Sequence, residues 1–158
     1  MKAVTYQGIK NIEVREVKDP TIKNSDDIIV KITTSAICGS DLHLIHGMIP
    51  SMPTDFVIGH EPMGVVEEIG PDVRNLKKGD RVIIPFNVSC GTCWYCQHDL
   101  TSQCDNSNPH GDIGGFFGYS ELTGGYAGGQ AEYMRVPYGN FTPFKIPENC
   151  EMEDEKLV

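Results

Sequence analysis

The chain has 158 residues, with 13 Lys and Arg against 22 Asp and Glu, and its net charge is −9. This acidic balance argues against DNA, RNA and anionic membranes as partners, because a negative surface is repelled by each of them. No apolar run approaches the ~18 residues that a membrane helix needs, and the N-terminus lacks the apolar stretch of a secretion signal. The sequence therefore predicts one cytoplasmic globular domain.

Short runs rich in β-branched residues recur along the chain, separated by Gly and Pro turns. This pattern indicates a small barrel or sandwich of short strands. The run at 12–17 alternates apolar and polar residues, which predicts a half-buried strand. Helix signals are weak: a turn or two after Ser40, one near Asp99 and a start near Glu151. We expect strands at 1–6, 12–17, 27–37, 63–69, 81–84, 131–136 and 141–146.

Glycine is concentrated in one segment, residues 111–129, which hold 8 of the 17 glycines. Glycine makes the interior of a helix or strand costly, so this segment is predicted to be a long loop. No Gly-Lys-Ser/Thr sequence follows it, and therefore a phosphate-binding loop is not expected.

Four cysteines lie within fifteen residues, at Cys90, Cys93, Cys96 and Cys104. Four thiolates satisfy the tetrahedral preference of Zn²⁺ completely and leave no open position, so the predicted site is structural. An iron–sulfur cluster uses the same four ligands and stays an alternative, as do free thiols or a redox pair.

A second group of candidate ligands is more dispersed. Cys38 and His60 each end a run of β-type residues, where a rigid scaffold can aim a side chain. Each is followed by an acidic residue, Asp41 or Glu61, that could orient an imidazole or adjust the charge of a metal site. The spacing alone leaves open whether these are metal ligands or ordinary core residues.

Together, the motifs resemble the zinc-dependent medium-chain alcohol dehydrogenases over nearly the whole chain. They are Cys-Gly-Ser-Asp-x-His at 38–43, Gly-His-Glu at 59–61, Gly-Asp-Arg-Val at 79–82 and the four-cysteine segment. The Gly-Gly-Tyr-Ala-Gly-Gly-Gln-Ala-Glu-Tyr run at 124–133 is most similar to the glutathione-independent formaldehyde-dehydrogenase-like subgroup.

The resemblance implies a mainly β fold, the GroES-like, partly open β-barrel with short helices and a zinc-binding lobe. The catalytic domain would cover residues 1–147, with the structural zinc lobe at 88–106. Residues 148–158 would begin the helix that leads to a dinucleotide-binding domain. The 158 residues themselves contain no βαβ fingerprint of such a domain. We therefore expect this fragment alone to be inactive in hydride transfer.

The resemblance also implies the roles of individual residues. Cys38 and His60 match two ligands of a catalytic zinc, Glu61 matches a carboxylate beside that zinc, and Asp41 matches the partner of the ligating imidazole. The third ligand of the subgroup is a carboxylate close to where this chain ends, and Cys150 does not match its position. We therefore expect an incomplete catalytic site and about one tightly held zinc per chain.

The implied reaction is the oxidation of a small alcohol, or the reduction of an aldehyde, by hydride exchange with NAD or NADP. Ser40 and His43 match a proton relay from the substrate oxygen toward solvent, and Phe86 matches a residue of the substrate pocket. The alternative is a non-enzymatic zinc-binding structural or interaction module. A GroES-class co-chaperonin would have no use for four clustered thiols. An exposed apolar face would make a homo-oligomer possible.

Overall fold

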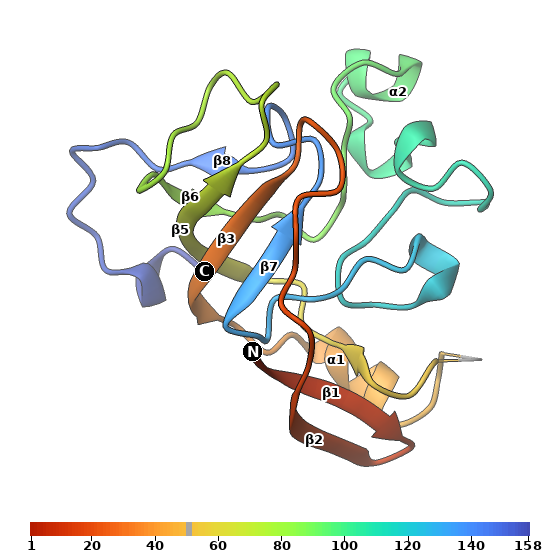
Figure 1. Cartoon of the computed structure of the whole chain (residues 1–158). Helices are drawn as coiled ribbons and strands as arrows, with labels where there is room; N and C mark the ends of the chain where they lie inside the picture. The colour runs from red at the N-terminus through yellow and green to blue at the C-terminus, as the bar shows by residue number, and fades with distance from the viewer. Residues whose placement is uncertain (50–51) are drawn as a thin grey trace.

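The computed structural model describes residues 1–49 and 52–158 and contains two antiparallel sheets (Figure 1). The smaller sheet has the strand order β2-β1-β4, and the larger has the order β7-β3-β5-β6-β8. The strands are β1 (Lys2–Gly8), β2 (Asn11–Glu16), β3 (Ile28–Ser35), β4 (Phe56–Val57), β5 (Pro62–Ile69), β6 (Arg81–Ile83), β7 (Tyr133–Val136) and β8 (Phe144–Lys145). The helices are α1 (Gly39–Ile45) and α2 (Trp94–Gln97), and 3₁₀ turns cover Thr101–Gln103, Asp105–Ser107, Glu121–Thr123 and Asp154–Lys156.

The larger sheet carries the main hydrophobic core. Its central strands β3 and β5 pair from Ile28↔Ile69 to Ser35↔Pro62, and β-branched residues suit this buried, pleated surface. Both sheets are open in the described ranges, so the expected mainly β, partly open architecture is confirmed. The side chains buried in this core are Ile28, Val30, Val66, Val73, Leu76, Val82, Ile84, Val88, Phe117, Met134 and Val136.

Strand β2 forms one edge of the smaller sheet and pairs with β1 in a hairpin. All six residues of β2 are exposed, including Ile12 at 42% and Val14 at 68%. The expectation of a half-buried strand at 12–17 is therefore wrong about burial, although it placed the strand correctly. The alternation did not produce a buried face, because none of the described elements covers either side of this edge strand.

The helical elements are few and short. The turns expected after Ser40 are present as α1, and α2 ends two residues before Asp99, near the second expected position. Where a helix start was expected over 148–158, the structure shows one 3₁₀ turn, Asp154–Lys156. None of the described helices has both the length and the apolar character needed to cross a membrane.

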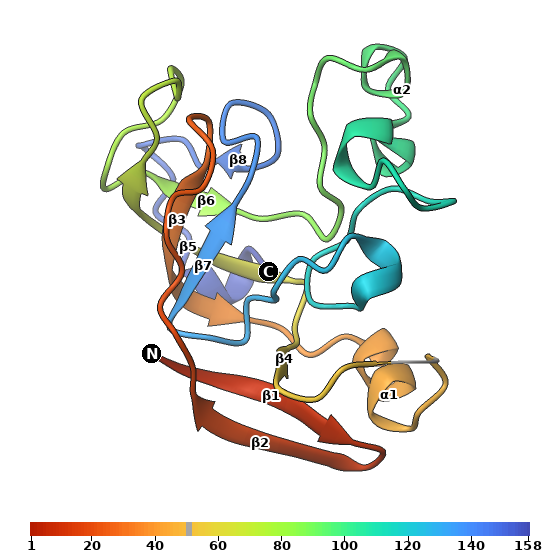
Figure 2. The same cartoon turned by 45° about the vertical axis from the view of Figure 1, so that its right-hand side comes forward.

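The segment after β6 leaves the sheets and forms a lobe around α2, as two views of the chain show (Figures 1 and 2). The chain then returns through the glycine-rich residues 111–129, which form the predicted loop and contain a 3₁₀ turn at Glu121–Thr123. This loop runs back toward α1 and the smaller sheet. It therefore connects the lobe to the region where β3 ends.

The C-terminal residues fold back on the larger sheet, where Arg81 of β6 binds them. Its guanidinium donates to the carbonyl oxygens of Cys150 (2.9 Å) and Met152 (2.7 Å) and pairs with the carboxylate of Asp154 (2.5 Å). Asp154 also accepts a hydrogen bond from the Thr33 hydroxyl on β3. One arginine thus fixes the path of this segment across two strands.

Candidate metal sites and active-site pocket

The pairing of β3 with β5 brings Cys38 and His60 together. Because the strands are antiparallel, the end of β3 lies beside the start of β5, and the backbone N–H of Ala36 donates to the carbonyl of Glu61 (3.0 Å). Cys38 follows β3 and His60 precedes β5, so both arise at the same end of the strand pair. Ligand atoms of Cys38, His60 and Glu61 all lie within 4.8 Å of one another.

A single buried carboxylate, that of Asp41 on α1, contacts both Cys38 and His60. Its Oδ2 accepts a hydrogen bond from the backbone N–H of Cys38 at 2.9 Å, at the start of α1. Its Oδ1 lies 3.3 Å from His60 Nδ1, and neither of these atoms has a well-aligned hydrogen-bond partner among the described residues. Asp41 is only 1% exposed, so the contact with the imidazole is shielded from water. This is the placement needed to orient a metal-binding imidazole.

Ser40 lies on the other side of the imidazole, with its Oγ 2.9 Å from His60 Nε2. The hydrogen-bonding carboxylate of Asp41 does most to raise the pKa of His60 to about 9, whereas burial of the imidazole acts to lower it. Hydrogen bonds from the hydroxyl and backbone of Ser40, and then from His60, lower the pKa of the Cys38 thiol. A metal ligand must be deprotonated, so Cys38 is prepared for binding, whereas His60 must first release a proton.

A pocket of about 380 Å³ opens over these groups. Its polar end is formed by Cys38, Ser40, His60 and Glu61, and Phe86, expected in a pocket from the sequence, lies in its wall. Further aromatic side chains complete that wall, namely Phe116, Phe117 and Tyr119. The pocket therefore combines a set of metal donors with an apolar surface, which is typical of small-molecule sites.

Two further residues singled out in the sequence lie outside the lining of this pocket. His43 is on α1, three residues beyond Ser40, and its side chain is exposed. Cys150 is half-buried in the C-terminal segment and belongs to neither candidate metal group. The role of His43 in a proton relay stays a prediction.

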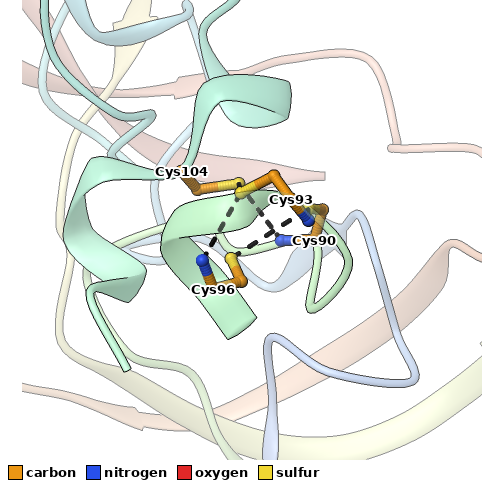
Figure 3. Close-up of side chains that lie close together, drawn as sticks. All are labelled: Cys90, Cys93, Cys96 and Cys104. Atoms are coloured by element: carbon orange, nitrogen blue, oxygen red, sulfur yellow. Dashed lines mark hydrogen bonds between the residues drawn. The ribbon is translucent and has the colours of Figure 1, made fainter. Parts of the chain in front are cut away.

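The four cysteines of the lobe converge from α2 and the turns beside it (Figure 3). All four Sγ atoms lie within 4.8 Å of one another; Cys90 and Cys96 are 4.0 Å apart, and Cys93 and Cys104 are 3.9 Å apart. A tetrahedral ion with Zn–S distances of about 2.3 Å needs sulfur atoms ~3.8 Å apart. The lobe therefore fits one four-thiolate zinc ion, and this spacing is too tight for a cluster of several iron atoms.

Hydrogen bonds favour the thiolate form of Cys90, whereas burial disfavours that of Cys96. Cys90 Sγ accepts from the backbone N–H groups of Thr92 (3.3 Å) and Cys93 (3.2 Å) and from the Asn106 amide (3.2 Å). Burial raises the pKa of Cys90, but hydrogen bonds, led by those from Thr92, outweigh it and lower the pKa to about 6. Burial raises the pKa of Cys96 to about 12. Four thiolates so close together need a compensating cation, which supports a metal in the lobe.

The sequence did not single out Phe116 and Tyr119, although both lie in the pocket wall. They belong to the glycine-rich loop, and a loop prediction gives no reason to place a side chain in a site. The available signal was the aromatic run Phe-Phe-Gly-Tyr at 116–119, because exposed loops rarely concentrate large apolar side chains.

Comparisons with known proteins identify the family of this chain. The chain is 68% identical over 157 residues to AdhB, an uncharacterized zinc-type alcohol dehydrogenase-like protein of Bacillus subtilis (strain 168), across 99% of this chain and 42% of that protein. It is 40% identical over 162 residues to the glutathione-independent formaldehyde dehydrogenase of Pseudomonas aeruginosa (strain LESB58), across 99% of this chain and 40% of that protein.

Among solved structures, the alcohol dehydrogenase TADH from Thermus sp. ATN1 matches with a TM-score of 0.86 and 38% identity, across 94% of this chain and 41% of that one. The chain thus spans about two fifths of the length of these relatives. The family model for the alcohol dehydrogenase GroES-like domain matches residues 24–148, which confirms the expected fold class and resemblance. The chain belongs to the zinc-type alcohol dehydrogenase family and contains its GroES-like domain.

Proposed function

We propose that the protein carrying this chain is a zinc-dependent dehydrogenase that oxidises small alcohols or reduces aldehydes by hydride exchange with NAD or NADP. The observation that supports this most is the joint placement of Cys38, His60 and Glu61 at the polar end of an aromatic pocket. Relatives named alcohol dehydrogenase and formaldehyde dehydrogenase support the same reaction class.

The donor atoms of the pocket suit a divalent ion, because thiolate, imidazole and carboxylate are the ligands that zinc accepts. We assign Cys38 and His60 to this ion, as expected from the sequence, and add Glu61, expected only beside the ion, as a third donor because the ligand atoms of all three lie within 4.8 Å of one another. The ion would supply Lewis-acid polarisation of an alcohol or carbonyl oxygen. Asp41 orients His60 through Nδ1. The four cysteines of the lobe would hold a separate, structural zinc.

The chain's own groups can handle the proton that an alcohol must lose. Ser40 Oγ lines the pocket, so its hydroxyl is placed to take a proton from a substrate hydroxyl while it passes its own proton on toward solvent. His43, exposed on α1, is the proposed acceptor nearer to solvent. Phe86 and Phe116 would offer apolar surface to the carbon part of the substrate.

Nicotinamide binding is proposed for a different part of the protein. Every pairing between the named strands is antiparallel, so the described residues contain no parallel βαβ unit for a dinucleotide. We propose that residues 1–147 form the catalytic domain, that 148–158 lead toward the dinucleotide-binding domain, and that the 158 residues alone do not transfer hydride.

Location and association are also part of the proposal. A cytoplasmic protein is in keeping with its acidic charge of −9 and its dehydrogenase relatives. Association of like chains is supported by large apolar side chains that are exposed, such as Ile37 (77%) and Leu42 (49%).

The test replaces Cys38 with serine in the protein that carries this chain. We expect alcohol-dependent NADH or NADPH formation to disappear and one metal equivalent to be lost, while circular dichroism and the metal of the lobe stay unchanged. Cys150→Ser, outside both metal groups, is the matched control and should behave as wild type. A fully active Cys38→Ser protein would contradict the proposal. A protein that binds zinc but turns over no alcohol or aldehyde would instead favour the non-enzymatic zinc module.

A further inference from the structure

Tyr119 lies beside the ring of His60, although it comes from the glycine-rich loop. The two ring centroids are 6.1 Å apart and the ring planes meet at 81°. This perpendicular arrangement is one that aromatic pairs prefer. Tyr119 also packs against a cluster of buried side chains, namely Tyr6, Leu44, Phe56 and Ile58. Its ring is therefore held by side chains of the smaller sheet and α1 as well as lying beside His60.

The backbone next to Tyr119 is fixed against the backbone next to His60. Gly118 has φ +62, and a Cβ on it would lie 2.2 Å from the carbonyl oxygen of Gly59. The backbone N–H of Gly118 also donates to the carbonyl of Tyr126 (2.8 Å). Only a glycine allows such a close approach, so direct contact between the two backbones sets the position of Tyr119 relative to His60.

The polar contacts of His60 do not restrain every motion of its imidazole ring. Ser40 contacts Nε2 and Asp41 contacts Nδ1, so each of the two ring nitrogens has one polar contact. Two such contacts do not prevent the ring from tilting about the line that joins them. A perpendicular aromatic ring packed beside the imidazole restrains that tilt.

We propose that Tyr119 is a positioning residue for His60, and that its ring, rather than its hydroxyl, holds the imidazole plane in the orientation that metal binding needs. The inference rests on the proposed function only in requiring a metal at Cys38, His60 and Glu61. It predicts that replacing the ring at residue 119 weakens metal binding in the pocket and does not change metal binding in the lobe.

Cobalt titration of the metal-free protein that carries this chain tests the inference, because Co²⁺ reports its ligand geometry in its visible absorption. The spectrum of Cys38→Ser isolates the contribution of the lobe, which then serves as an internal reference. We expect Tyr119→Leu to weaken Co²⁺ binding in the pocket by about three- to tenfold, the loss typical of one aromatic pair, and to change the pocket spectrum. Tyr119→Phe should match wild type.

The matched control is Tyr133→Leu, which removes another half-buried tyrosine, on β7, and should leave both sites unchanged. If circular dichroism shows that Tyr119→Leu does not fold, Tyr119→Met takes its place, since it keeps bulk without a ring. Wild-type pocket affinity in the ring-free variant, or an equal loss in Tyr119→Phe, would overturn the inference while leaving the proposed function intact. A wild-type protein that takes up Co²⁺ only in the lobe would overturn both.

Discussion

Ser40 Oγ lies 2.9 Å from His60 Nε2, on the opposite side of the imidazole from Asp41. The same serine is the main cause of the lowered pKa of the Cys38 thiol. One hydroxyl therefore touches the imidazole, favours the thiolate and faces the pocket. Its removal should affect proton transfer and ligand protonation together.

Ser40→Ala should lower turnover by roughly 10²-fold, the size of effect expected when a positioned proton-transfer group is lost. The pKa of the Cys38 thiol should rise toward its ordinary value, because its main hydrogen-bond donor is gone. The measurements are kcat as a function of pH, with metal content determined in parallel. Ser25→Ala, at an exposed serine, is the control. Wild-type kcat at every pH in Ser40→Ala would exclude a role for this hydroxyl.

Cys96→Ser should remove the metal of the lobe and lower the melting temperature by about 10 °C or more, since a structural ion contributes several kcal/mol to folding. Elemental analysis should show the loss of one zinc per chain. Cys150→Ser, which removes a half-buried cysteine outside both groups, should keep the zinc content and melting temperature of wild type. If the two variants retain equal zinc, the lobe is not a metal site.

Arg81→Met should release the C-terminal segment, because it removes the ion pair with Asp154 and hydrogen bonds to two carbonyl oxygens. We expect the free energy of unfolding to fall by about 1–3 kcal/mol and limited proteolysis after residue 147 to become faster. Lys156→Met removes an ion pair with Glu153 in which both side chains are well exposed, and should change stability by less than about 0.5 kcal/mol. Equal effects of the two variants would contradict the anchoring role of Arg81.

A pH-dependent contribution to stability is expected from Asp80. Burial raises its pKa, but hydrogen bonds from Lys145 (2.8 Å) and from the backbone N–H of Lys77 (2.9 Å), with the nearby positive charges, outweigh burial and place the pKa below its usual range. Such a carboxylate stabilises the fold above its unfolded pKa of about 3.9, and this contribution is lost as the pH falls through the folded pKa.

Lys145→Met should therefore be less stable than wild type at neutral pH, and the difference should shrink as the pH falls below the unfolded pKa of about 3.9 and through the folded pKa of Asp80. Urea unfolding of both proteins at neutral and acidic pH measures this. A difference that stays constant over the whole range would assign the effect of Lys145 to packing rather than to charge.

The sequence predicted best those features that depend on local spacing. Cys90, Cys93 and Cys96 come from one tight loop, so the spacing of their ligands is nearly a sequence property, and the strands followed from runs of β-branched residues. Burial was harder, because the alternation in β2 tells which side chains share a face but not whether another layer covers it. The contact of Tyr119 with His60 could not be predicted, since it depends on two distant glycines meeting, at positions 59 and 118.

The exposed strand β2 has a consequence for how this molecule behaves in concentrated solution. Its backbone forms an unpaired sheet edge, and Glu13, Arg15 and Glu16 place charges along that edge. Such charges discourage a strand from another molecule from adding to the sheet. The apolar side chains of Ile12 and Val14 are exposed on the same strand, so these charges are what separates the edge from a partner strand. Replacing these charged residues with apolar ones should therefore make intermolecular strand pairing begin at this hairpin.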